Sequence, residues 1–353
     1  MNLQNNLSGH NNNSLKVLVK RGSSVESIHR AHASICDTKG RILMKAGSCE
    51  YETFIRSALK PFQALPFLTS GASEKYNLDN KTLALACGSH NGSSFQAIPF
   101  VSSGASTKIN SSTKSIALSC GSHSGSSVQA RTAFKLLWNA DIDIKELKCP
   151  TPQHRESKLQ HNCSGKHSAF LATCKKMDWD LDSYLMGHHP LQKEIFRRVA
   201  ELLKIPVEEL IAERDDCGAP TLLLRLSQMA VLYAHLSKSD QPEFEKITRA
   251  MTNNPDLIAG EGYFDSELIK RGHNQIISKG GSEGIQCIGL LGEGIGLSIK
   301  VEDGSKRAKH AVAIHLLRQL EWITPTAIEE LDEIILQKKP GIYIEVEGEL
   351  KIP

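Results

Sequence analysis

Strand-like sequence lies near the two ends of this chain, and helix-like sequence fills the middle. Short apolar runs that are typical of strands occur at 17–19, 32–36, 41–43, 276–278, 285–288, 297–301 and 342–346. Apolar residues that recur every three or four positions predict helices at 191–203, 221–236, 244–251 and 306–320. We therefore expect an α/β or α+β fold, with a sheet formed from both terminal regions and a helical middle region.

Length and charge exclude several classes of protein. The 353 residues include 42 basic and 39 acidic side chains, and a formal charge of +3 is too small to indicate nucleic acid or an anionic membrane as partner. No apolar run approaches the roughly 18–20 residues of a membrane span. Residues 1–14 read as a disordered Asn-rich tail and not as a signal peptide, and 15–353 as one domain. Nine irregularly spaced cysteines argue against a disulfide framework, so we expect a reducing, cytoplasmic location.

A tandem repeat interrupts the first half of the chain. Residues 62–94 and 95–127 are identical at 21 of 33 positions, and most of the other changes are conservative. Two copies are too few for a solenoid, which needs about three units to bury its faces. Each copy is predicted to contain a helix, a loop, a strand and then a Ser-His turn.

A serine and a lysine three residues apart precede a proline. Pro61 is tolerated only in the first turn of a helix, so the helix is expected to begin close to Ser57. Ser57 and Lys60 then share one face at the positive end of the helix dipole. A neutral, partly desolvated Lys60 could take the Ser57 proton, as in Ser-Lys hydrolases. A capping serine beside a solvated lysine explains the same pattern, and the residues alone leave both interpretations open.

Each repeat copy contains a Cys-Gly-Ser-His turn, at 87–90 and at 120–123. Glycine there permits a sharp turn that exposes the serine. That serine could relay protons or bind a substrate amide near Ser57 and Lys60. An ordinary serine-capped turn is the alternative interpretation.

Two other turns place a cysteine ahead of a predicted helix. Residues 161–167 read HNCSGKH before a helix expected from about Ala169, and 215–220 read DDCGAP. Thiols at helix starts have lowered pKa values and can hold zinc as thiolates. No CxxC pair is present, so the ligands would have to come from distant segments, and structural buried cysteines are the alternative.

A lysine followed by paired glycines lies between two predicted strands, at 279–284 (KGGSEG). Such glycines let backbone amides approach a bound anion or an oxyanion. The segment lacks the G-x-x-x-x-G-K-[ST] pattern of a P-loop, and no nucleotide cofactor is expected.

In this order, the motifs resemble the L-asparaginase II family of the rhizobial inducible type, and its cyanobacterial members in particular. The resemblance covers about residues 19–320 and rests on the segments 56–64 (RSALKPFQA), 122–125 (SHSG), 161–167, 216–221 and 279–284. It implies a fold related to serine β-lactamases, penicillin-binding proteins and glutaminases. The implied reaction converts L-asparagine to L-aspartate and ammonia through an acyl-enzyme.

The resemblance also implies roles for individual residues. Ser57 becomes the nucleophile and Lys60 its base, while the serine of a Ser-His turn pairs with Lys279. A zinc ion is implied on Cys163, Lys166 and Cys217, with water as the fourth ligand. The implied substrate-binding or supporting residues are Arg56, His90, His123, His167 and Asp215. A homodimer is implied by the family alone.

The duplication is a departure from the family, which has one Ser-His segment. Ser89 lies 32 residues after Ser57, and Ser122 lies 41 residues before Cys163, and each spacing fits the family. Either Ser89 or Ser122 can therefore reach the site; we favour Ser89 because it is tethered closely to Ser57. Two other functions remain open. One is a penicillin-recognising or β-lactamase-like acyl enzyme, although the chain has no K-T-G motif. The other is a non-catalytic descendant disrupted by the duplication.

Overall fold

The computed structural model describes residues 13–77, 79–89, 128–155, 157–336 and 340–353. The expected tail falls almost entirely outside these residues. The second repeat copy, with Ser122 and His123, also lies outside them, as does His90.

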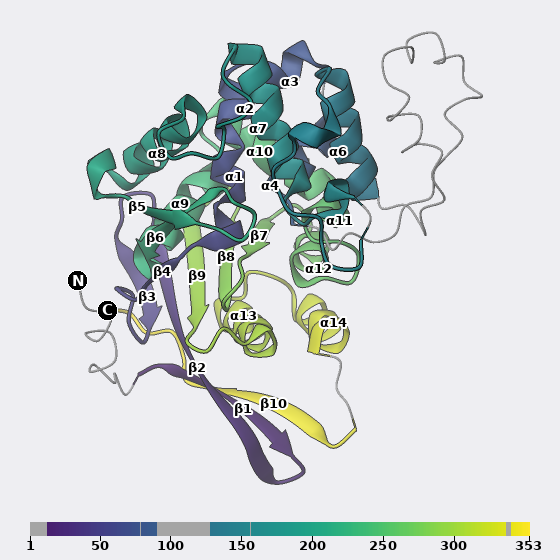
Figure 1. The fold of residues 1–353 in the computed structure, drawn as a ribbon. Coiled ribbons are helices and arrows are strands. Elements are labelled where there is room, and N and C mark those ends of the chain that lie inside the picture. Colours follow the sequence, from purple (N-terminus) through teal and green to yellow (C-terminus); the bar gives the residue numbers. More distant parts are fainter. Residues whose placement is uncertain (1–12, 78, 90–127, 156, 337–339) are drawn as a thin grey trace.

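The main sheet has seven strands, which come from both terminal regions of the chain (Figure 1). Its order is β10-β1-β2-β9-β8-β7, and β3 pairs with β2 beside this path. The strands are β1 (Leu15–Arg21), β2 (Ser24–Asp37), β3 (Ile42–Ala46), β7 (Ile276–Gly280), β8 (Ile285–Leu290), β9 (Ile295–Val301) and β10 (Ile342–Glu347). Each strand pair is antiparallel. The sheet from both terminal regions and the helical middle confirm the expected fold class.

Most of the described helices lie between the N-terminal and C-terminal strands in sequence. They are α1 (Lys60–Gln63), α2 (Leu65–Thr69), α3 (Ala72–Lys75), α4 (Asn80–Cys87), α6 (Val128–Asn139), α7 (Ser164–Met177), α8 (Pro190–Leu203), α9 (Leu226–Lys238), α10 (Pro242–Asn253), α11 (Pro255–Ile258) and α12 (Phe264–Arg271). After β9 come α13 (Lys306–Leu320) and α14 (Pro325–Leu336). The described 3-10 turns are η2 (Arg56–Leu59), η5 (Ile144–Glu146), η6 (Lys158–Gln160) and η7 (Val207–Glu209). A smaller sheet, in the order β4-β6-β5, contains β4 (Glu52–Phe54), β5 (Ile211–Arg214) and β6 (Pro220–Arg225).

Helices cover both faces of the main sheet. Helix α9 packs on β9, β2 and β8, while α13 packs on β9 and β1 with α14 beside it. The close approach of α9 requires a glycine, because a Cβ atom at Gly296 of β9 would lie 2.1 Å from the carbonyl oxygen of Ala230. On the other face, Leu297, Ile299 and Val301 are buried in the cluster that includes the apolar residues of α13. In Figure 1 the other helices gather at one end of the sheet, and β1, β2 and β10 extend away from them.

Two predicted elements are wrong. Residues 221–225 form strand β6 and not the start of a helix, and α9 begins only at Leu226. The apolar run before the first Cys-Gly-Ser-His turn is helix α4 and not a strand, because the Asp79 side chain accepts from the backbone N–H of Thr82 and caps it. The predicted helix at 306–320 is confirmed with the same bounds.

The described cysteines are all unpaired and buried: Cys36, Cys49, Cys87, Cys149, Cys163, Cys174, Cys217 and Cys287. In the described part of the chain, no helix is both long enough and apolar enough to cross a membrane.

Candidate active site

Lys60 is a fully buried lysine where three segments of the chain meet. Its Nζ atom donates to the carbonyl oxygen of Gly88 at 2.7 Å and to that of Asn162 at 2.8 Å. It also lies 2.8 Å from the Ser89 hydroxyl oxygen. Burial disfavours the ammonium form and lowers the pKa of Lys60 from 10.5 to about 8. A substantial fraction of this amine is therefore neutral in mildly alkaline solution, and a neutral amine accepts a proton.

Ser57 lies in η2, which begins at Arg56 and runs directly into α1. The expected helix start near Ser57 is confirmed, with Pro61 in the first turn of α1. In a 3-10 turn the side chains at i and i+3 eclipse, so Ser57 and Lys60 share a face. The hydroxyl that contacts the Lys60 amine is nevertheless that of Ser89. The pairing of Lys60 with Ser57 stays a prediction.

Ser89 is held where α4 ends. Its backbone N–H donates to the Ile258 carbonyl oxygen at 2.6 Å. A Cβ atom at Gly88 would lie 2.2 Å from the Leu257 carbonyl oxygen, so this close contact requires glycine. The structure therefore places the serine of the first repeat copy beside Lys60, while Ser122 of the second copy lies outside the described residues.

Cys163, Lys166 and Cys217 meet beside this site. Cys163 precedes α7, Lys166 is in its first turn, and Cys217 lies in the hairpin turn between β5 and β6. The Lys166 Nζ atom donates to the Cys217 sulfur at 3.2 Å. A hydrogen bond from Cys163 and the charge of Lys166 hold the pKa of Cys217 well below its usual range. The turn at 215–220 leads into a strand, so the expected helix-start effect on the Cys217 thiol is wrong.

This arrangement fits a zinc ion. Two sulfurs and one amine are soft-to-borderline donors of the kind that zinc accepts, provided that the lysine is deprotonated. The buried His167 side chain is hydrogen-bonded to the Cys217 thiol, and its Nδ1 atom lies 2.7 Å from the Tyr184 hydroxyl, so His167 packs directly against these ligands. The described residues contain no cluster of three His, Cys, Asp or Glu side chains that could hold a metal, so such a site depends on the lysine.

An ion pair fixes the hairpin turn of Cys217 to the start of η2. Arg56 Nε donates to Asp215 at 2.8 Å, and another guanidinium nitrogen contacts Asp216. The Arg56 backbone N–H donates to the Thr221 hydroxyl at 3.0 Å. These contacts couple the position of Ser57 to that of Cys217.

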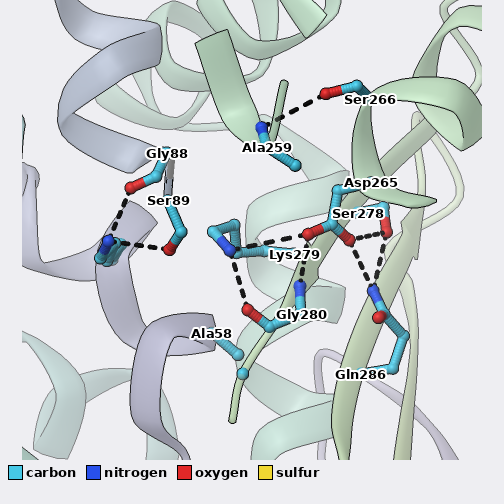
Figure 2. A network of polar contacts seen from close by, with 12 residues as sticks. Ala58, Gly88, Ser89, Ala259, Asp265, Ser266, Ser278, Lys279, Gly280 and Gln286 are labelled. Atoms are coloured by element: carbon cyan, nitrogen blue, oxygen red, sulfur yellow. Dashed lines mark hydrogen bonds and ion pairs between the residues drawn. The ribbon is translucent and has the colours of Figure 1, made fainter. Parts of the chain in front are cut away.

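Lys279 is the next-to-last residue of β7 and belongs to a buried polar network (Figure 2). Its Nζ atom donates to the Gly280 carbonyl oxygen at 2.8 Å and lies 3.6 Å from Asp265. Asp265 also accepts from the Ser278 hydroxyl, the Gly280 N–H and the Gln286 amide, at 2.7–2.8 Å. Burial alone would raise the pKa of Asp265, but the ammonium groups of Lys279 and Lys309 bring it to about 2. Asp265 is therefore a permanent anion at neutral pH.

One pocket of about 230 Å³ joins these groups. Its lining includes Ser57, Ser89 and Lys279, and it extends past Asp265 to Lys309 on α13. In Figure 2 the side chains of Ser89 and Lys279 point toward a common space. The pocket therefore brings the Ser57 and Ser89 hydroxyl groups together with the buried Lys279 amine, and these are groups that an acyl-transfer reaction needs.

The sequence motifs missed Asp265, Gln286 and Lys309. Asp265 lies in an amphipathic helix and Gln286 in an apolar strand, and no local motif marks either residue as part of a site. Lys309 carried a usable signal, because the KRAK start of α13 places cations at the positive end of a helix.

Family comparison agrees with the motifs. A family model described as L-asparaginase II matches residues 17–96 and 93–352. The chain belongs to the L-asparaginase II family. The two matched segments of this L-asparaginase II chain meet at 93–96, where the first repeat copy ends and the second begins. No curated protein is significantly similar to it in sequence.

Solved structures with some similarity are distant. A protein described as Mglu in its native form is 14% identical with a TM-score of 0.39, and the match covers 83% of this chain and 65% of that one. Mglu in its tris and glutamate form is 16% identical with a TM-score of 0.37, and the match covers 83% and 60%. A protein from Bacteroides dorei DSM 17855 described as a predicted beta-lactamase is 11% identical with a TM-score of 0.38, and the match covers 87% and 93%. This chain thus spans 65% and 60% of the two Mglu chains.

Proposed function

We propose that this protein is an L-asparaginase that hydrolyses the side-chain amide of L-asparagine to L-aspartate and ammonia. Family membership supports an amidohydrolase. The observation that carries the proposal is the pocket that Ser57 and Ser89 line next to the buried Lys60 amine. The lowered pKa of Lys60, about 8, suits a base that works near neutral pH.

Ser57 is the proposed nucleophile. Its oxygen attacks the amide carbon, and its proton passes through the Ser89 hydroxyl to the neutral Lys60 amine. The C–N bond then breaks, and the Lys60 ammonium returns a proton to the departing nitrogen, which leaves as ammonia. A water molecule hydrolyses the acyl-enzyme by the same route, releasing aspartate and restoring Ser57. Backbone amides at the start of η2 are the proposed oxyanion donors.

Zinc is the proposed cofactor, held by Cys163, Lys166 and Cys217. When bound, it would polarise a substrate oxygen and order the site. His167 and Asp215 are proposed as supporting residues of this centre, because His167 is buried against it and Asp215 is bound to Arg56.

The remaining parts of the proposal depend on resemblance. The motifs favour the rhizobial inducible type, with similarity to cyanobacterial members. A homodimer and a cytoplasmic location are proposed with it; the unpaired state of the described cysteines is compatible with a reducing environment.

The direct test is ammonia release by purified protein from L-asparagine, with L-glutamine in parallel. We expect Ser57→Ala to lower kcat by at least about 1,000-fold, because it removes the nucleophile. Ser89→Ala should lower kcat by about 100-fold or more, because it interrupts the proton path. Ser23→Ala, an exposed serine in the turn after β1, is the control and should behave as wild type.

Two results would overturn the proposal. One is near-normal turnover by Ser57→Ala. The other is stoichiometric labelling of Ser57 by a fluorescent penicillin together with no ammonia release, which would instead support a penicillin-recognising enzyme.

A further inference from the structure

Besides Lys279, a second buried lysine lines the pocket, and the proposed proton path through Ser89 and Lys60 does not include it. Lys309 is 7% exposed and lies in the first turn of α13. Its Nζ atom donates to the Gly281 carbonyl oxygen at 3.2 Å, the one hydrogen-bond partner that it has among the described residues. An ammonium group has three N–H donors, so Lys309 retains donors for a ligand in the pocket.

The surroundings of Lys309 are short of negative charge. Asp265 is the buried carboxylate of this pocket, and it faces both Lys279 and Lys309. Glu283 is exposed at the rim, and Asp303 is already bound to His29 and to the Ser305 N–H. Two buried ammonium groups thus share one buried carboxylate. An uncompensated cation away from water is costly, so the pocket favours an anionic ligand.

The start of α13 adds to this positive potential. The pocket lining includes Gly304, Lys306, Lys309 and His310, which all lie at or next to the N-terminal end of this helix. Helix N-termini normally carry acidic residues, but the first turn of α13 has none. A carboxylate in the pocket would complement both the helix end and the lysines.

Gln286 supplies an acceptor next to this cation. Its Oε1 atom is buried and has no hydrogen-bond partner among the described residues, while its Nε2 atom is bound to Asp265 and Ser278. The position that a Cβ atom of Gly280 would take lies 2.9 Å from both Gln286 Oε1 and Lys309 Nζ. A free acceptor and a cation therefore flank the same point. An α-amino acid carries the complementary pair of groups on one carbon: an ammonium group, which donates to an acceptor, and a carboxylate, which binds a cation.

We propose that Lys309, together with the start of α13, binds the α-carboxylate of an α-amino acid, while Gln286 Oε1 accepts from its α-ammonium group. This subsite deepens the proposed function, on which it rests, because it fixes which end of the substrate lies at α13. The side-chain amide then points toward Ser57 and Ser89 at the other end of the pocket. The substrates of this site are accordingly free amino acids with a side-chain amide and not amides that lack the carboxylate.

Binding to the wild-type protein tests the subsite without turnover. Isothermal titration calorimetry compares L-aspartate with L-isoasparagine, whose α-carboxylate is replaced by a carboxamide. We expect L-isoasparagine to bind about 10- to 100-fold more weakly, the usual cost of losing a hydrogen-bonded charge. Succinate, which lacks the ammonium group, should also bind more weakly than L-aspartate. Equal affinity for L-aspartate and L-isoasparagine would overturn the proposal.

A pair of variants on α13 identifies the residue. Lys309→Met should weaken L-aspartate binding by about 10- to 100-fold and raise the KM for L-asparagine, with little change in kcat. Arg307→Met removes a charge from the same turn, but the Arg307 side chain contacts His29, so this control should match wild type. Lys309→Arg keeps the charge and should retain most of the affinity. Unchanged L-aspartate affinity in a folded Lys309→Met protein would contradict the role of Lys309.

The experiments separate this subsite from the proposed reaction. Carboxylate-dependent binding without ammonia release would sustain the subsite and defeat the asparaginase. Ammonia release together with equal affinity for L-isoasparagine and L-aspartate would sustain the asparaginase and overturn the subsite.

Discussion

At the scale of single residues, the environment of Lys60 decides how the site responds to pH. Its pKa of about 8 in the folded protein lies below its usual 10.5, because burial penalises the ammonium. We expect log kcat/KM for L-asparagine to rise with pH and to level off above about 8, where Lys60 is a neutral base. A pH–rate profile measured with constant ionic strength checks this. A profile that is flat between about pH 6 and 9 would remove Lys60 from the role of base.

The lowered pKa of Lys60 also makes the free energy of unfolding depend on pH. Between about pH 8 and 10.5 the unfolded chain keeps a proton on Lys60 that the folded chain has released. The unfolded state therefore binds more protons, and the contribution of Lys60 to the free energy of unfolding rises with pH across this range. Urea unfolding of wild type and Lys60→Met at two pH values in the range would isolate this contribution.

Loss of the Asp265 carboxylate should be costly to the stability of the folded protein. Asp265→Asn leaves Lys279 and Lys309 without their buried counter-charge, and breaking a buried pair in this way costs about 3–5 kcal/mol in the free energy of unfolding. Denaturant unfolding measures this cost. Asp240→Asn is the matched control, because its ion pair with Lys238 is exposed and should contribute less than about 1 kcal/mol.

At the scale of elements, strands and helices with regular patterns could be predicted from sequence, whereas segments next to the site could not. The spacing of apolar residues identifies α8 because that helix buries one stripe, and it identifies α13 although most of the middle of that helix is buried. It fails at 221–225, where a largely buried strand has the same apolar composition as a buried helix. Local motifs identify Ser57 and Lys60, but the contact between Ser89 and Lys60 depends on packing of α4 against α11 and α7.

The contact between α9 and β9 gives a stability prediction at this scale. Gly296→Ala places a methyl group 2.1 Å from the Ala230 carbonyl oxygen, so helix and sheet must separate. We expect a loss of about 1–3 kcal/mol or more in the free energy of unfolding. Gly187→Ala is the control, because nothing lies within 4 Å of its added Cβ atom. A Gly296→Ala protein as stable as this control would show that α9 shifts freely on the sheet.

At the scale of the whole molecule, the duplication predicts a tolerated deletion. Ser89 of the first copy contacts Lys60, so a chain that lacks 95–127 keeps this serine and resumes at α6. We expect the shortened protein to fold and to release ammonia from L-asparagine at a rate within about tenfold of the full chain. Loss of activity in a folded deletion variant would instead place the second copy, with Ser122, in the site.

Zinc should hold the start of α7, with Cys163 and Lys166, against the turn between β5 and β6 that contains Cys217. Metal analysis is expected to find about one zinc per chain, and a chelator should lower both Tm and ammonia release, because a ligand bound to the folded state stabilises it. Cys217→Ser should lose the metal, whereas Cys49→Ser should keep it. A metal-free wild-type protein with full activity would contradict the proposed cofactor.

The pairing of strands from opposite ends of the chain has a consequence for biosynthesis. Strand β2 pairs with β9, and Ala31 lies opposite Val301, so the sheet cannot close until the ribosome has made nearly the whole polypeptide. Such long-range contacts are slow to form, because loop closure has to precede them. The nascent N-terminal strands therefore keep an unpaired edge during translation. A molecular chaperone that shields this edge should raise the yield of folded protein.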